Sequence, residues 1–72
     1  MTTLIEFQVI GDERIHCAGC ETRIGFALRR LPGIRDVQVS ARSQRIAVSI
    51  DPEEIGSEQV RARLRELGYE VA

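Results

Sequence analysis

The stretch "IRDVQVSARSQRIAVSI", residues 34–50, decides the fold because it predicts a β-hairpin. In each half, apolar side chains recur at every second position: Val37 and Val39, then Ile46, Val48 and Ile50. This alternation is typical of strands that bury one face. The residues "ARSQ" between the two halves are short enough for a hairpin turn. We therefore expect antiparallel strands over 34–40 and 45–50.

Outward from the hairpin, the sequence predicts one helix on each side. The preceding helix carries an amphipathic stripe made of Cys20, Ile24, Ala27, Leu28 and Leu31. Pro32-Gly33 should end it, because proline disfavours helical geometry in the residue before it. The following helix, "EQVRARLREL" (58–67), has the inward stripe Val60, Leu64 and Leu67. Ser57 is expected to cap this second helix and Gly68 to end it.

Two further strands complete the expected fold. "LIEFQVI" (4–10) places Ile5, Phe7 and Val9 on one face, and "YEV" (69–71) is a short final strand. The order β-α-β-β-α-β predicts an α+β fold of the ferredoxin-like plan, an antiparallel four-stranded sheet with two helices on one face. A chain of 72 residues has the length of one domain, so we expect residues 1–72 to form a single unit.

The composition narrows the classes of function. The net charge is -1, so no excess of basic residues exists to displace counterions from nucleic acid. The longest uncharged stretches are too short to span a bilayer, and "MTTLIEFQVIGDER" lacks the features of a secretory signal. We therefore expect no nucleic-acid partner, no membrane insertion and a cytoplasmic location, where thiols stay reduced.

The segment "ERIHCAGCETRI" (13–24) contains both cysteines and the only histidine of the chain. The predicted helix start puts Cys17 on the loop after the first strand and Cys20 in the first helical turn. Unpaired amide N–H groups and the positive end of the helix dipole lie at such a place, and both stabilise a thiolate. Thiolate is the form of cysteine that binds metal, so this CxxC indicates a metal or redox site.

Four kinds of site are open to such a pair of cysteines. Two thiolates suffice for a d¹⁰ monovalent ion such as Cu(I), which soft sulfur ligands favour. Zinc takes about four ligands and would need His16, Glu21 or water as well. A thiol oxidoreductase also carries CxxC at a helix start, but this chain has no tryptophan and is short for that fold. Buried structural cysteines would suit Cys20 on the apolar stripe, but would explain neither Cys17 nor the spacing.

Taken together, these residues resemble the heavy-metal-associated domain family, a ferredoxin-like module of copper chaperones, P-type metal ATPases and mercury-binding proteins. The resemblance runs from about Leu4 to Val71 and rests on "IHCAGC", "RIGFALRRLPGI", "VQVS", "RIAVSID" and "LGYEV". It implies that Cys17 and Cys20 are the metal-binding pair. It also implies that Tyr69 lies near the metal loop, although a core aromatic with a wet hydroxyl is an equal alternative.

Two positions beside the cysteines differ from the family pattern. The family usually has methionine two places before the first cysteine, packed beneath the loop, where this chain has Ile15. Isoleucine has a similar bulk, so the same packing role is expected. His16, directly before Cys17, could add a nitrogen ligand or be an exposed loop residue.

The resemblance implies a metal carrier and not an enzyme. We expect a Cu(I) metallochaperone that passes the ion by thiolate exchange to a metal-transporting P-type ATPase or another CxxC protein. Met1 and the end of the chain soon after the last strand favour a free-standing protein. The alternatives are a metal-binding domain of a P-type ATPase, or a protein that binds Zn(II) or Hg(II). Two CxxC loops could also share an ion in a metal-bridged homodimer.

Overall fold

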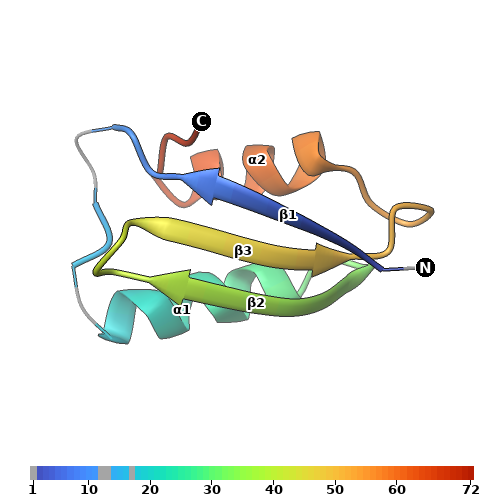
Figure 1. Ribbon diagram of the computed structural model, residues 1–72, viewed down its shortest axis with the longest axis horizontal. Helices are drawn as coiled ribbons and strands as arrows, with labels where there is room; N and C mark the ends of the chain where they lie inside the picture. Colours follow the sequence, from blue (N-terminus) through green and yellow to red (C-terminus); the bar gives the residue numbers. More distant parts are fainter. Residues whose placement is uncertain (1, 12–13, 17) are drawn as a thin grey trace.

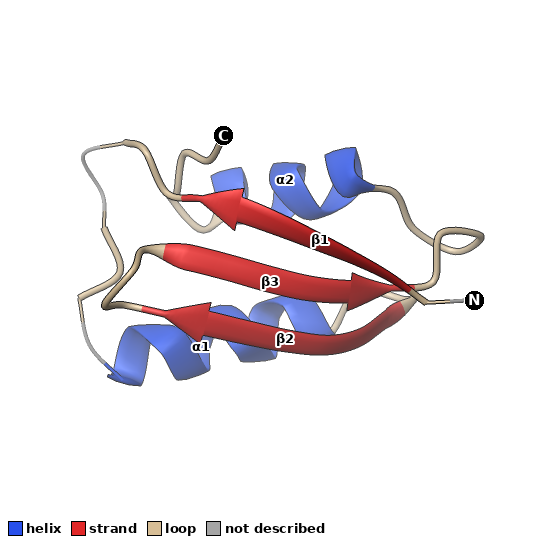
Figure 2. Cartoon of the chain, in the orientation of Figure 1, coloured by secondary structure: helices blue, strands red, loops and turns tan. Residues whose placement is uncertain are grey.

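The computed structural model of the chain describes residues 2–11, 14–16 and 18–72. Its elements, in order, are β1 (Thr3–Gln8), α1 (Ala18–Arg29), β2 (Ile34–Ser40), β3 (Arg45–Ile50) and α2 (Ser57–Glu66). The strands form one layer, and both helices cover the same face of it (Figure 1). Figure 2 shows this two-layer arrangement by element type. The expected α+β ferredoxin-like architecture is confirmed.

The sheet contains the predicted hairpin and places it beside β1. Its order is β1-β3-β2 with both pairs antiparallel, so β3 is the central strand. Val48 of β3 pairs with Ile5 on one side and with Val37 on the other. Since successive side chains of a strand point to opposite faces, this register brings the apolar sets of all three strands to the helix-covered face.

The predicted fourth strand at 69–71 is wrong: among the described residues, this segment forms one isolated antiparallel bridge, between Val9 and Val71, and no strand. The backbones of Gln8 and Ala72 also exchange two hydrogen bonds, at 2.9 and 3.4 Å. The Ile10 N–H donates to the Glu70 carbonyl with an N–O distance of 2.9 Å. Within the described ranges the sheet therefore has three strands, and residues 70–72 lie beside the end of β1.

The end of α2 explains why this strand is so short. Gly68 adopts a left-handed φ of 100°, and the Tyr69 N–H donates to the Leu64 carbonyl at 2.9 Å. The Gly68 N–H donates to the Arg65 carbonyl at 3.0 Å, which completes a Schellman turn. Gly68 thus ends the helix as predicted. Because the turn also uses the N–H of Tyr69, this residue belongs to the end of α2 and not to the expected strand.

The start of α2 differs from the prediction. Gly56, not Ser57, is the N-cap residue, and its extended backbone makes no side-chain cap. The Gln59 carboxamide instead accepts a hydrogen bond from the Gly56 N–H at 2.8 Å. Glutamine at the third helical position reaches back to the cap in this way and leaves Ser57 as an exposed first helical residue.

The core lies between the sheet and the helices. The predicted stripes supply most of it, and the fully buried side chains with the largest volumes are Ile24, Leu28, Ile46, Leu64, Val48 and Val60. Ile15, which precedes α1, is also buried in this cluster. The core therefore reaches from the sheet up to the segment that leads into α1. In the part of the chain that the structure describes, neither helix is long and apolar enough to cross a membrane.

Candidate metal centre

Cys20 is the third residue of α1 and is half-buried against the core cluster. Its partner in the predicted metal pair, Cys17, lies outside the described residues, so the pairing of the two sulfurs stays a prediction. The geometry at Cys20 agrees with the predicted position in the first helical turn. N–H groups there lack intrahelical acceptors, so the local backbone favours an anionic sulfur.

Glu21, considered as an extra zinc ligand, is engaged elsewhere. Its Oε2 atom accepts a hydrogen bond from the Ala41 N–H at 2.7 Å, which ties the start of α1 to the turn between β2 and β3. Among residues 2–11, 14–16 and 18–72, no three His, Cys, Asp or Glu side chains gather closely enough to hold a metal ion. Any zinc shell would therefore involve Cys17 or ligands from outside the described chain.

Ile15 and His16 are adjacent in the sequence but differ in burial. The Ile15 side chain is 2% exposed and belongs to the core cluster, while its packing role beneath the metal loop stays a prediction. His16 is exposed to solvent. Its role as a nitrogen ligand stays a prediction, as does the metal-loop role of Tyr69. Tyr69 is half-buried and packs against the core cluster, which suits the core-aromatic alternative.

Sequence reasoning missed Gln44, which holds the segment before α1. The Ile15 N–H donates to Gln44 Oε1 at 2.9 Å, and Gln44 Nε2 donates to the Ile15 carbonyl at 2.8 Å. Gln44 lies in the turn "ARSQ", and a polar residue in a turn gives no periodic signal in the sequence that would single it out. Only its left-handed φ of 59° marks it as unusual, and that angle is a property of the structure.

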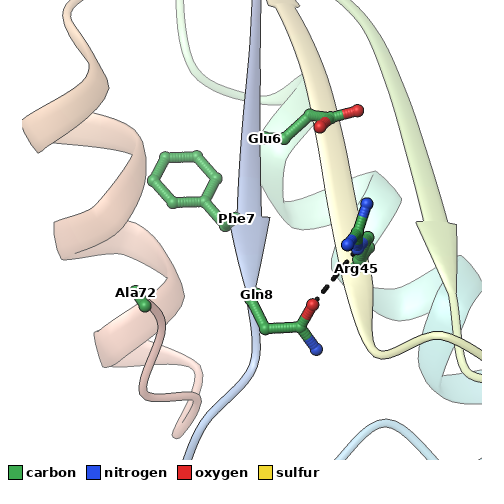
Figure 3. A pocket seen from close by; sticks show the side chains of 5 residues that line it. All are labelled: Glu6, Phe7, Gln8, Arg45 and Ala72. Atoms are coloured by element: carbon green, nitrogen blue, oxygen red, sulfur yellow. Dashed lines mark hydrogen bonds between the residues drawn. The ribbon is translucent and has the colours of Figure 1, made fainter.

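A shallow hollow of about 220 Å³ lies along β1, lined by Glu6, Phe7, Gln8, Arg45 and Ala72 (Figure 3). The Arg45 Nε–H donates to Gln8 Oε1 at 3.2 Å, while the Phe7 ring points toward α2. The hollow is smaller than the roughly 300 Å³ at which ligand pockets begin, and Cys20 is not among the described residues that line it. It therefore gives no support to a small-molecule active site.

Among the described residues, the carboxylate with a shifted pKa is that of Asp51, which follows the end of β3 and not the turn beside the start of α1. The pKa of Asp51 is lowered, first because its carboxylate accepts a hydrogen bond from the Glu53 N–H at 3.1 Å. Partial desolvation opposes this shift, and a hydrogen bond from Arg35 at 3.3 Å adds to it. Because β3 leads away from the turn at 41–44, the hydrogen bonds of Asp51 stabilise the loop after β3 and not the segment around the CxxC motif.

Comparison with known proteins gives a consistent result. The sequence profile of the heavy-metal-associated domain matches residues 13–70. A copper-exporting P-type ATPase from Bacillus subtilis is 36% identical over 67 residues, which are 93% of this chain and 8% of the ATPase. A zinc-transporting ATPase from Synechocystis sp. is 30% identical over 56 residues, 78% of this chain and 8% of that protein. This chain thus spans less than a tenth of the length of these relatives.

Among solved structures, the CopZ metallochaperone superposes with a TM-score of 0.87 at 20% identity, over 97% of this chain and 100% of that one. At this level of identity the likeness establishes the fold alone.

Proposed function

The chain belongs to the heavy-metal-associated domain family, and from this premise we propose that it binds Cu(I) through the thiolates of Cys17 and Cys20 and hands the ion to a partner. The observation that carries the proposal is the position of Cys20, half-buried in the first turn of α1 where the backbone favours an anion. In the sequence, Cys17 stands directly before the first residue of α1, and this CxxC spacing supports the proposal that both thiolates bind one ion.

The donor set favours copper over zinc. Cu(I) is soft and needs two thiolates, whereas zinc takes about four ligands. The carboxylate nearest to Cys20 in sequence, Glu21, already accepts a hydrogen bond from Ala41. The names of the relatives include copper and zinc transporters, so zinc is the second candidate.

Transfer would proceed by ligand exchange. A thiolate of the partner enters as a third ligand, and one of the two original sulfurs then leaves, in the manner of thiol–disulfide exchange. A partner with a similar CxxC pair makes the transfer nearly isoenergetic, and each tenfold difference in affinity adds about 1.4 kcal/mol of bias. No covalent bond of a substrate is broken, so the proposed activity is metal transfer and not catalysis.

The proposed partner is a cytoplasmic CxxC domain, such as that of a metal-transporting P-type ATPase. The same chemistry would operate if residues 1–72 were one metal-binding domain of a longer ATPase. Two copies that share an ion through their CxxC loops would form a metal-bridged dimer, which we expect when the metal is scarce relative to protein.

Anaerobic competition for Cu(I) and Zn(II) tests the proposal. The reduced protein should take up one equivalent of Cu(I), and Cys17→Ser and Cys20→Ser should each lose it. Ser57→Ala, at the exposed start of α2, serves as the control and should bind as the unmodified protein does. Tight Zn(II) binding with feeble Cu(I) binding would overturn the choice of metal.

A further inference from the structure

Gln44 forms the same hydrogen bonds to Ile15 that a neighbouring strand would form. Its Oε1 accepts from the Ile15 N–H at 2.9 Å, and its Nε2 donates to the Ile15 carbonyl at 2.8 Å. The backbone of Gln44 is held in turn, because its carbonyl accepts from the Val9 N–H at 2.9 Å. The segment before α1 is therefore tied through one side chain to the end of the sheet.

A second tie starts from the same turn. The Ala41 N–H donates to Glu21 Oε2 at 2.7 Å. In the sequence, Ile15 stands two residues before Cys17, and Glu21 stands one residue after Cys20. Residues 41–44 thus fasten the chain on both sides of the CxxC motif. In Figure 1 this turn lies at the same end of the molecule as the start of α1.

The backbone of Gln44 is unusual for a residue with a side chain. Its φ of 59° lies in the left-handed region, which glycine adopts without steric penalty and most other residues avoid. Glycine in this turn would lack the carboxamide that reaches Ile15. The unusual backbone conformation and the two hydrogen bonds to Ile15 thus occur at the same residue. Strained backbone conformations tend to be found at functional sites.

We propose that Gln44 is a positioning residue for the CxxC motif: its carboxamide fixes the backbone of Ile15, which stands two residues before Cys17 in the sequence, and this raises affinity for a soft metal ion. The metal part of this inference rests on the proposed function. The physical reason is preorganisation, since a loop already held near its bound geometry loses less conformational freedom when two sulfurs close on an ion.

The buried side chain of Ile15 is the competing explanation for loop order. At 2% exposure it anchors the segment by packing alone. The two effects separate in Gln44→Gly, which removes the carboxamide, leaves Ile15 in place and suits the left-handed φ. Ser43→Gly is the matched control, because it adds a glycine to the same turn and leaves the Gln44 carboxamide intact. Gln44→Asn keeps an amide but is one methylene too short to span the gap.

The experiment measures three quantities on each variant: hydrogen exchange of the Ile15 amide in the reduced, metal-free protein, Cu(I) affinity by anaerobic competition, and the unfolding temperature. In Gln44→Gly and Gln44→Asn, we expect faster Ile15 exchange and Cu(I) binding weakened by about tenfold, the lower end of effects seen for groups that support metal ligands. Ser43→Gly should match the unmodified protein in exchange and affinity. The unfolding temperature of Gln44→Gly should fall, because the carboxamide's hydrogen bonds to Ile15 and to the Ala41 carbonyl are lost and glycine's relief of the left-handed backbone offsets only part of that loss.

Two results would overturn the inference. Unchanged Ile15 exchange in Gln44→Gly would mean that the hydrogen bonds do not hold the segment in solution. Faster exchange with unchanged Cu(I) affinity would mean that they have no bearing on the metal. If the unmodified protein takes up no Cu(I), the proposed function fails instead, and Gln44 is then judged by Ile15 exchange and by Hg(II) affinity of the same variants.

Discussion

The carboxylate of Glu21 in α1 accepts a hydrogen bond from the backbone N–H of Ala41, 2.7 Å away in the turn between β2 and β3. The two residues are twenty positions apart in the chain. The contact joins the first turn of the helix to the sheet at the end of the molecule that holds Cys20. Glu21 also places a negative charge in the first helical turn, where it interacts favourably with the helix dipole.

Glu21→Ala should lower the free energy of unfolding by about 1–2 kcal/mol, because a hydrogen bond to a charged group is lost together with the favourable dipole contact. Glu21→Gln keeps an acceptor oxygen for the Ala41 N–H and should lose less. Urea denaturation of the metal-free protein measures both. Equal losses in the two variants would show that the charge, and not the hydrogen bond, is what stabilises the helix start.

Gly25→Ala should raise the free energy of unfolding by about 1 kcal/mol, the difference between glycine and alanine inside a helix. An added Cβ at Gly25 would meet the Arg29 Nη1 atom at 3.6 Å, an ordinary contact. Gly33→Ala is the opposite case. Gly33 has a φ of 86°, and a Cβ there would lie 2.8 Å from the Glu54 Cβ.

Gly33→Ala should therefore destabilise by more than about 1 kcal/mol, since alanine adopts a left-handed φ only with strain. Thermal unfolding of both variants, followed by circular dichroism, compares them directly. Destabilisation by Gly25→Ala would indicate that the close surroundings of α1 leave no room for a methyl group.

Asp51 should make stability depend on pH in the acid range. Its pKa is lowered below the ordinary 3.8 in the folded protein, mainly by the hydrogen bond from the Glu53 N–H. A carboxylate of this kind stabilises the fold above its unfolded pKa, and that contribution is lost as the pH falls through the lower folded value. The decline should therefore begin near pH 4 and continue below it.

Asp51→Asn should flatten this part of the pH profile, because an amide does not titrate. Unfolding temperatures measured from pH 7 to pH 2.5 give the comparison. Arg35→Ala, which removes the hydrogen bond of 3.3 Å to the same carboxylate, should flatten the profile only in part. A profile of Asp51→Asn that coincides with that of the unmodified protein would contradict the assignment.

The sequence predicts those parts of the fold that follow from periodicity. Val37, Ile46 and Val48 belong to apolar sets that recur at every second position of their strands, and each is buried on the helix side of the sheet. The period also identifies Ile24 and Leu28 as the core face of α1. Cys20 is found in the first turn of that helix because the apolar stripe begins with it.

The sequence does not show which of several possible hydrogen bonds a backbone group forms. The expected strand at 69–71 depends on Tyr69, but the N–H of Tyr69 closes the end of α2 instead. The expected cap at Ser57 is displaced because Gln59 reaches the Gly56 N–H. The role of Gln44 could not be predicted from any periodic pattern. Its contact is with Ile15, 29 positions away in the sequence, and depends on a left-handed backbone conformation at Gln44.

His16→Ala separates the copper and zinc alternatives at the candidate metal centre. His16 is exposed, and Cu(I) held by two thiolates needs no further ligand, so Cu(I) affinity should stay within about threefold, or roughly 0.7 kcal/mol, of that of the unmodified protein. Zinc would use the imidazole to complete its shell, so any Zn(II) affinity should fall. His16→Gln retains a polar side chain and serves as the control for loop solvation. A loss of Cu(I) affinity of tenfold or more in both variants would place His16 among the copper ligands and contradict the two-coordinate site.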